Sequence, residues 1–157
     1  EAMYKSIAYA MLSTTMAGQQ LVPRFKKEKF AAIRQANFNN LYEFFSKIKF
    51  FKLPRQLSEV KTSWLAFPLT ISENAPFSRL EIVKFLEMNG IQTRPIFTGN
   101  VLKQPAFSKI NYKNLGKDYE IANYIMENSF LIGCNHGLTE NHIEKIKNMF
   151  TTFLSKY

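Results

Sequence analysis

Apolar residues recur at helical spacing through the first third of the chain. From Phe25 or Lys26 to about Lys49 they return every three or four positions, which predicts one long amphipathic helix ending before Pro54. Its apolar stripe is formed by Phe30, Ile33, Leu41, Phe44, Phe45 and Ile48, interrupted by Asn37. A shorter helix is predicted over 13–21, because Pro23 cannot continue the ladder of backbone hydrogen bonds.

Short apolar runs then alternate with helical patterns. Strands are predicted over 63–71, 92–97 and 130–134. Pro68 lies within the first of them and has no amide hydrogen, which favours an edge position or a bulge. Three strands separated by helices indicate an α+β fold, with a small antiparallel or mixed sheet of about three strands covered by helices.

The helices between these strands have recognisable ends. Ser78 and Glu81 have the spacing of a capping box, and Asn89-Gly90 is typical of a left-handed helix end. Thr139 is the expected N-cap of the last helix. In the remaining helix, over 117–127, four residues are expected to face inward: Ile121, Ala122, Ile125 and Met126.

Length, charge and cysteine content narrow the class of protein. The chain has 157 residues, enough for one domain, and a net charge of +9 that would attract anions such as nucleic acid, phosphorylated metabolites or acidic membranes. The lysine and arginine side chains can equally lie on solvent-exposed faces of helices. The sequence contains no nucleic-acid-binding motif, and no apolar run reaches the roughly 20 residues of a membrane span. Cys134 is the only cysteine, which excludes an internal disulfide and fits a reducing, cytoplasmic location.

The segment after Gly90 brings candidate binding groups close together. Arg94 can clamp a carboxylate or phosphate through two parallel hydrogen bonds, and Asn100 offers a donor and an acceptor to a sugar hydroxyl. Gly99 favours a particular backbone shape. The alternative interpretation is a strand edge followed by an ordinary tight turn.

Two other side chains, those of His136 and Cys134, carry groups that can take part in chemistry. His136 precedes a helix N-terminus and is a candidate substrate-binding group or general acid-base, or else a loop histidine whose hydrogen bonds are satisfied. Cys134 is expected to be a small core residue. No pair of carboxylates has the spacing of general acid-base chemistry, so the residues predict no catalytic group and no metal ligands.

Several blocks resemble the C-terminal small domain of the DegT-type, vitamin B6-dependent sugar aminotransferases and dehydrases. The blocks are Glu73–Arg79, Thr93–Asn100 with Gln104–Phe107, Ile125–Gly133, and His136–Thr139. Within that family they look most like the nucleotide-linked 4-keto-6-deoxyhexose 3-dehydrases of lipopolysaccharide synthesis. The resemblance implies that Arg94, Gly99, Asn100 and His136 lie toward a nucleotide-diphosphate sugar in the cleft between domains.

The segment Tyr9–Ala17 resembles the same family more weakly and differs from it at two positions. Ala10 replaces an asparagine that meets the cofactor phosphate, and Leu12 replaces a basic residue. The resemblance further implies that the large domain, with its cofactor-binding groups, would precede this chain. We therefore expect 1–24 to be a helical segment leading to that domain, and 25–157 to be the small domain.

The resulting hypothesis is that this chain is part of an enzyme. The parent would use pyridoxal phosphate (PLP) or pyridoxamine phosphate (PMP), act on a nucleotide sugar and form a homodimer, while this chain alone would bind no cofactor and be inactive. The alternative is a non-catalytic module that holds an anionic ligand or a partner chain, a role that Ala10 and Leu12 favour. Nucleic-acid binding is the least favoured of the three.

Overall fold

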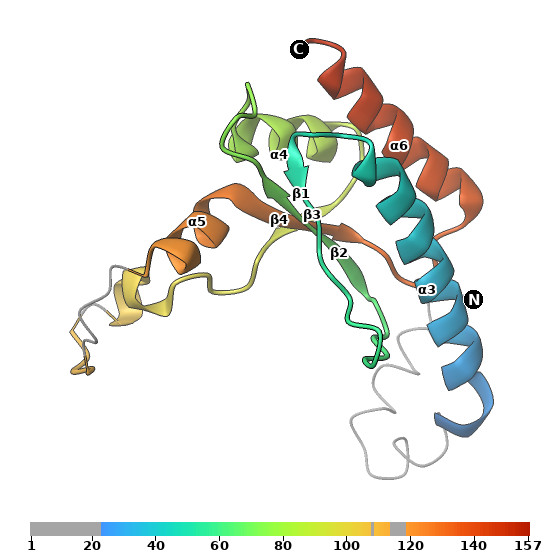
Figure 1. Cartoon of the computed structure of the whole chain (residues 1–157), viewed down its shortest axis with the longest axis horizontal. Coiled ribbons are helices and arrows are strands. Elements are labelled where there is room, and N and C mark those ends of the chain that lie inside the picture. Colours follow the sequence, from blue (N-terminus) through green and yellow to red (C-terminus); the bar gives the residue numbers. More distant parts are fainter. Residues whose placement is uncertain (1–22, 108, 114–118) are drawn as a thin grey trace.

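The computed structural model describes residues 23–107, 109–113 and 119–157 (Figure 1). The helix predicted over 13–21 and the altered positions Ala10 and Leu12 lie outside these described residues. The expected boundary between residues 24 and 25 falls within the first described helix.

Four antiparallel strands form one sheet with the order β1-β2-β4-β3. The strands are β1 (Phe51–Lys52), β2 (Ala66–Ile71), β3 (Thr93–Pro95) and β4 (Ser129–Gly133). The predicted α+β class is confirmed, and the sheet has one strand more than expected. That strand, β1, has only two residues, too few for an alternating pattern to be visible in the sequence.

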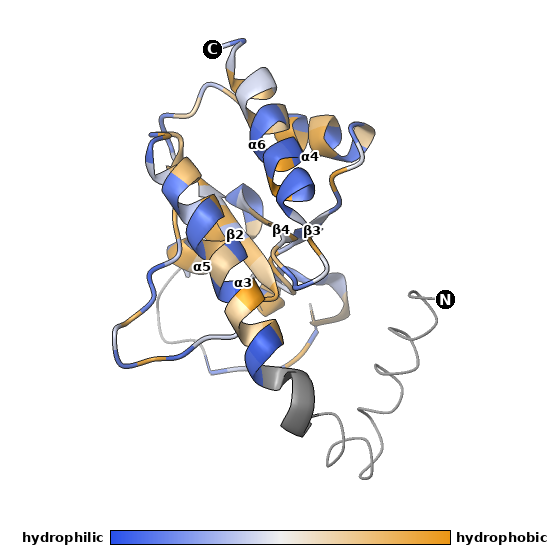
Figure 2. Cartoon of the chain, turned by 90° about the vertical axis from the view of Figure 1, so that its right-hand side faces the viewer, coloured by the Kyte–Doolittle hydropathy of each residue, from blue (hydrophilic) through white to orange (hydrophobic). Residues whose placement is uncertain are grey.

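Three helices cover one face of the sheet and a fourth lies on the other side (Figure 1). The first three are α3 (Pro23–Ser46), α4 (Arg79–Met88) and α6 (Glu140–Leu154), and the fourth is α5 (Glu120–Asn128). Two short 3-10 turns, η1 (Val101–Lys103) and η2 (Pro105–Phe107), lie between β3 and α5. In Figure 2, hydrophilic and hydrophobic residues alternate along α3 and α6, as expected of helices with one buried side.

The core lies between the sheet and the three-helix layer. Phe45 of α3 is fully buried and packs edge-on against Phe150 of α6, with ring centroids 4.7 Å apart. Phe67 of β2 meets Phe45 from the sheet side, with centroids 5.4 Å apart. Cys134 is fully buried, as predicted, and its burial raises the pKa of the thiol to about 12, so it remains protonated.

The helix ends follow the predicted caps. The Ser78 hydroxyl and the Glu81 carboxylate form the full capping box of α4, and Gly90 after that helix has φ +73°. Thr139 caps α6, with the His142 ring in place of the usual acidic partner. The described part of the long helix begins at Pro23 and ends at Ser46, three residues before the predicted end near Lys49.

Two expectations about orientation were wrong. The strand β2 is internal, since it pairs with β1 and β4. Pro68 is tolerated there because it faces Leu131 as a non-hydrogen-bonded pair, so its nitrogen points to the side where β1 pairs only Thr70 and Ile71. Ile121 does not face inward either, because 79% of its surface is exposed.

None of the described helices is long and apolar enough to cross a membrane.

Candidate functional site

The face of the sheet opposite the three-helix layer carries Arg94. Alternation along the strands buries Phe67, Ile132 and Thr93 on the helix side, which places their neighbours on the other face. Pro68, Leu131 and Arg94 lie opposite one another in the register and therefore form one row across three strands. We call this side the open face, because α5 is the only described helix on it.

Arg94 is available on this face. Its side chain is exposed, and Nη1 donates one hydrogen bond to the carbonyl of Thr93 at 3.0 Å. The nearby carboxylate of Glu87 accepts instead from the amide and the hydroxyl of Thr93, the latter at 2.7 Å, and these bonds hold the pKa of Glu87 below its usual range. Within the described part of the chain Arg94 makes no ion pair, so its remaining donors can meet a ligand.

Gly99 and Asn100 build the turn that follows β3. Gly99 has φ +61°, and a Cβ added there would lie less than 3.0 Å from the side chain of Met126. Asn100 is only 7% exposed; its amide donates to Asn123 Oδ1 at 2.7 Å, and its Oδ1 accepts from the Leu102 amide at 3.0 Å. Both polar groups of Asn100 are therefore used to fix the turn against α5.

His136 lies at the other end of β4. Asn100 is tied to α5, which leads into Ser129, whereas His136 follows Gly133 at the far end of the strand. Gly99 and Asn100 therefore lie toward the end of β4 that α5 enters, Arg94 pairs with Leu131 in the middle of that strand, and His136 lies beyond its opposite end. Their roles toward a substrate stay predictions.

A different cation holds His136 in place. The Arg34 guanidinium donates from Nη2 to Nδ1 of His136 at 3.2 Å, and the imidazole stacks on Phe30 with ring centroids 3.9 Å apart. Because the Arg34 bond requires Nδ1 to accept, the neutral ring carries its hydrogen on Nε2. Burial, together with the Arg34 charge, lowers the pKa of His136.

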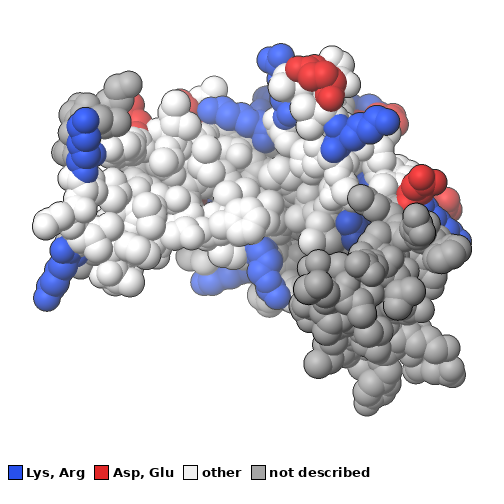
Figure 3. Space-filling model, turned by 90° about the horizontal axis from the view of Figure 1, so that it is seen from below, with Lys and Arg blue, Asp and Glu red and all other residues white. Residues whose placement is uncertain are grey.

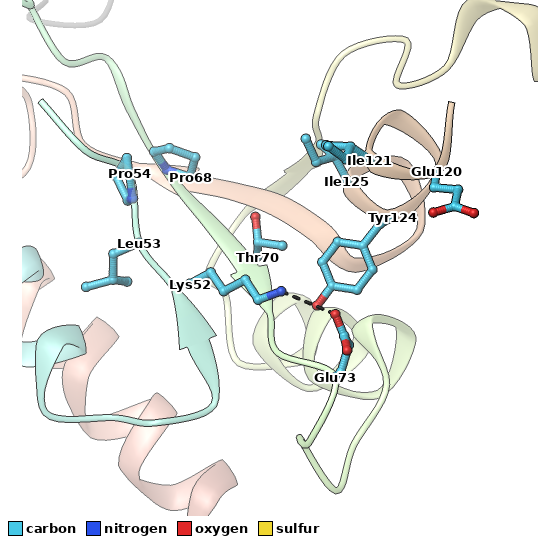
Figure 4. Close-up of a pocket in the computed structure, with 10 residues that line it drawn as sticks. All are labelled: Lys52, Leu53, Pro54, Pro68, Thr70, Glu73, Glu120, Ile121, Tyr124 and Ile125. Atoms are coloured by element: carbon cyan, nitrogen blue, oxygen red, sulfur yellow. Dashed lines mark hydrogen bonds and ion pairs between the residues drawn. The ribbon is translucent and has the colours of Figure 1, made fainter. Parts of the chain in front are cut away.

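The open face also contains a pocket of about 620 Å³ (Figure 4). One wall is formed by Leu53, Pro54 and Pro68, and the opposite wall by Ile121 and Ile125 of α5. The remaining lining residues are polar: Lys52, Thr70, Glu73, Glu120 and Tyr124. Sequence reasoning missed this pocket, because its residues come from three distant segments whose proximity depends on strand register and on where α5 packs.

Three polar side chains converge at one solvent-exposed end of the pocket (Figure 4). Lys52 Nζ lies 3.4 Å from Glu73 Oε1 and 4.5 Å from the centroid of the Tyr124 ring. The Tyr124 hydroxyl donates to the Ile71 carbonyl, which ties α5 to the end of β2. Tyr124 and then Glu73 raise the pKa of Lys52, so its ammonium form is favoured.

This lysine does not suit the chemistry of a vitamin B6 cofactor. A lysine that forms an imine must lose its proton, and proteins achieve this by lowering its pKa. The surroundings of Lys52 act in the opposite direction. We therefore derive no catalytic step from the pocket.

Comparison with known proteins places this geometry in a family. The model of the DegT/DnrJ/EryC1/StrS aminotransferase family matches residues 12–151. The chain belongs to this family. Among curated relatives, the lipopolysaccharide biosynthesis protein RfbH of Salmonella typhimurium is 34% identical over 154 residues, covering 96% of this chain and 35% of that protein. The GDP-4-keto-6-deoxy-D-mannose 3-dehydratase of Yersinia pseudotuberculosis is 32% identical over 143 residues, covering 90% and 35%.

Solved structures of the family share the fold. The E. coli GDP-4-keto-6-deoxy-D-mannose-3-dehydratase with bound hydrated PLP superposes with a TM-score of 0.74 at 22% identity, covering 85% of this chain and 33% of that one. An aminotransferase from Psychrobacter cryohalolentis gives a TM-score of 0.76 at 17% identity, covering 89% and 38%. The chain thus spans about a third of the length of the proteins it matches.

Proposed function

We propose that this chain is the C-terminal part of a nucleotide-sugar 3-dehydratase or aminotransferase that uses PLP or PMP. The observation that carries the proposal is the match of nearly the whole chain to a third of such enzymes. In this role the open face forms one side of the substrate cleft, and Arg94 contacts the anionic part of the nucleotide sugar. The cofactor and the groups that activate it lie on the part of the enzyme that the match does not cover.

A homodimer and a cytoplasmic location belong to the same proposal. Support for a further contact surface comes from large apolar side chains on the segment between β3 and α5. Phe97 is 88% exposed, and Ile110 and Tyr112 are exposed as well. Such groups gain free energy when another surface covers them.

A chimeric enzyme tests the proposal. Residues 12–151 would replace the matching segment of the Yersinia 3-dehydratase, and consumption of GDP-4-keto-6-deoxy-D-mannose would be followed by chromatography. Turnover by the chimera, absent from an otherwise identical protein that lacks the segment, is the expected result. A second chimera in the Salmonella protein guards against a junction that fails to fold, with binding of PLP followed in the visible spectrum.

Two outcomes separate the candidate functions. A folded chimera that takes up PLP but turns over no substrate would contradict the enzymatic role. Saturable binding of a nucleotide sugar by the 157-residue chain, together with such an inactive chimera, would favour the alternative of a non-catalytic module for an anionic ligand. The exposed guanidinium of Arg94, which makes one hydrogen bond to the Thr93 carbonyl and no ion pair within the described residues, is the observation that keeps this alternative open.

A further inference from the structure

The pocket on the open face and Arg94 have different electrostatic character. The pocket contains one cation, Lys52, and two carboxylates, Glu73 and Glu120, and Lys52 is already paired with Glu73. Its formal charge is therefore −1, although the whole chain carries +9. An anionic group would be repelled from this pocket and attracted to Arg94.

The shape of the pocket suits a flat neutral ring. In Figure 4, Pro54 and Pro68 stand opposite Ile121 and Ile125, with Thr70, Lys52 and Tyr124 between the two walls. Apolar walls with a few convergent polar groups are typical of small-molecule sites, in which the walls gain from burial and the polar groups orient the ligand. At its exposed end, the ammonium of Lys52 and the carboxylate of Glu73 offer a donor next to an acceptor, 3.4 Å apart. A nucleobase presents such adjacent groups along its edge.

The two features lie within reach of one molecule. Pro68 belongs to the pocket wall and shares its row with Leu131 and Arg94. Two strand spacings separate Pro68 from Arg94, which is roughly 10 Å of sheet. Leu131 between them is half-buried, and Figure 3 shows mostly uncharged surface across the middle of the lower side of the molecule.

We propose that the pocket holds the base of a nucleotide sugar and that its diphosphate lies against Arg94. This inference rests on the proposed function and assigns two parts of that substrate to two places on the open face. Pro68, Ile121 and Ile125 sandwich the base, Lys52 and Glu73 meet its polar edge, and Leu131 lies under the ribose. The sugar then points beyond β3, toward the part of the enzyme that this chain does not include.

Calorimetric titration of the 157-residue chain with guanosine, GDP and GDP-mannose tests the assignment. We expect saturable binding of all three, with GDP binding about 10- to 100-fold more tightly than guanosine, because charge-assisted hydrogen bonds contribute roughly 1.5–3 kcal/mol. Arg94→Ala should abolish the gain from guanosine to GDP and leave guanosine binding unchanged. Ile121→Asp should weaken guanosine at least tenfold by placing a carboxylate in the wall.

Matched variants control for charge and folding. Lys84→Ala removes an exposed cation from α4, and Leu80→Asp places a carboxylate at an exposed leucine of the same helix, away from the open face. Neither should alter binding of any of the three ligands. Circular dichroism confirms that each variant is folded.

Three results would overturn the assignment. The first is that GDP-mannose shows no saturable binding at concentrations up to 10-fold above a dissociation constant of roughly 1 mM. The second is inorganic diphosphate binding as tightly as GDP, which would leave the base without a site. The third is unchanged guanosine binding in Ile121→Asp. Each can occur while the chimeric enzyme is active, in which case the proposed function stands and the assignment of the pocket fails.

Discussion

Replacing Gly99 by alanine probes the turn that connects β3 to α5. The residue has φ +61°, a left-handed backbone conformation that costs a residue with a side chain roughly 1–2 kcal/mol of conformational free energy. The new methyl group would also lie less than 3.0 Å from Cβ and Cγ of Met126, and overpacking of this kind costs about 1–3 kcal/mol. We expect Gly99→Ala to lower the free energy of unfolding by about 2–5 kcal/mol, a large part of the roughly 5–15 kcal/mol of a typical domain.

Urea denaturation followed by the fluorescence of Trp64 measures this loss. Trp64 is the only tryptophan, and it stacks on Phe38 of the core with ring centroids 4.0 Å apart, so it reports global unfolding. Gly133→Ala is the matched control, because a Cβ there meets only ordinary contacts at 3.7 Å, and its effect should stay within about 0.5 kcal/mol.

A double variant separates the two costs. Met126→Ala removes Cγ and Sδ, two of the three atoms nearest to the new methyl group, and leaves Cβ in place. The pair should therefore be less destabilised than the sum of the single variants by part of the overpacking cost of about 1–3 kcal/mol. Strictly additive effects, or a loss below about 0.5 kcal/mol for Gly99→Ala alone, would refute the packing of the turn against α5.

Three further predictions address the core, a helix cap and a titrating group. Phe45→Ala should cost about 3–5 kcal/mol in the same denaturation assay, since the ring is fully buried, and a loss below about 1 kcal/mol would contradict its place in the core. Ser78→Ala should cost about 1 kcal/mol by removing the capping box, whereas no change would show that α4 begins elsewhere. In an NMR titration His136 should protonate below its ordinary pKa of about 6.5. The unfolded chain then binds this proton more readily, so the free energy of unfolding falls as the pH is lowered through 6.5. Arg34→Gln should raise the pKa of His136. Titration of His136 at or above pH 6.5 would contradict the contact with Arg34.

Local signals in the sequence were enough for most elements of the fold. The capping box of Ser78 and Glu81 and the left-handed Gly90 fixed both ends of α4, because the interactions involved lie within one turn of the chain. The strand β4 was recognisable from the apolar run over 130–134, which is continuous because both sides of the strand are buried near its start. The family resemblance, which rested on blocks in the right order, is confirmed by the family model that matches residues 12–151.

Features that depend on tertiary contacts could not be predicted. The strand β1 exists because Phe51 and Lys52 pair with Ile71 and Thr70, which a two-residue segment cannot reveal. Ile121 looked like a core residue from its spacing, but α5 packs on the sheet through its other end and leaves this side chain exposed. The burial of Asn100 against Asn123 likewise follows from where α5 lies.

The candidate site was predicted in part for the same reason. Arg94, Gly99 and Asn100 are close in sequence, so their place on one strand and the turn after it could be foreseen. Their hydrogen-bond partners could not be foreseen, because only the structure shows that Asn100 uses both polar groups internally while Arg94 uses one donor for the Thr93 carbonyl and keeps the others exposed. Lys52, Glu73 and Tyr124 converge from segments that carry no shared motif.

The kinetics of Arg94→Ala in the chimeric dehydratase test most directly whether this chain contributes substrate binding rather than chemistry. We expect KM for the nucleotide sugar to rise about 10- to 100-fold while kcat changes less than threefold, because the lost contact is made equally to substrate and transition state. A large fall in kcat with unchanged KM, or no effect on either constant, would contradict the account.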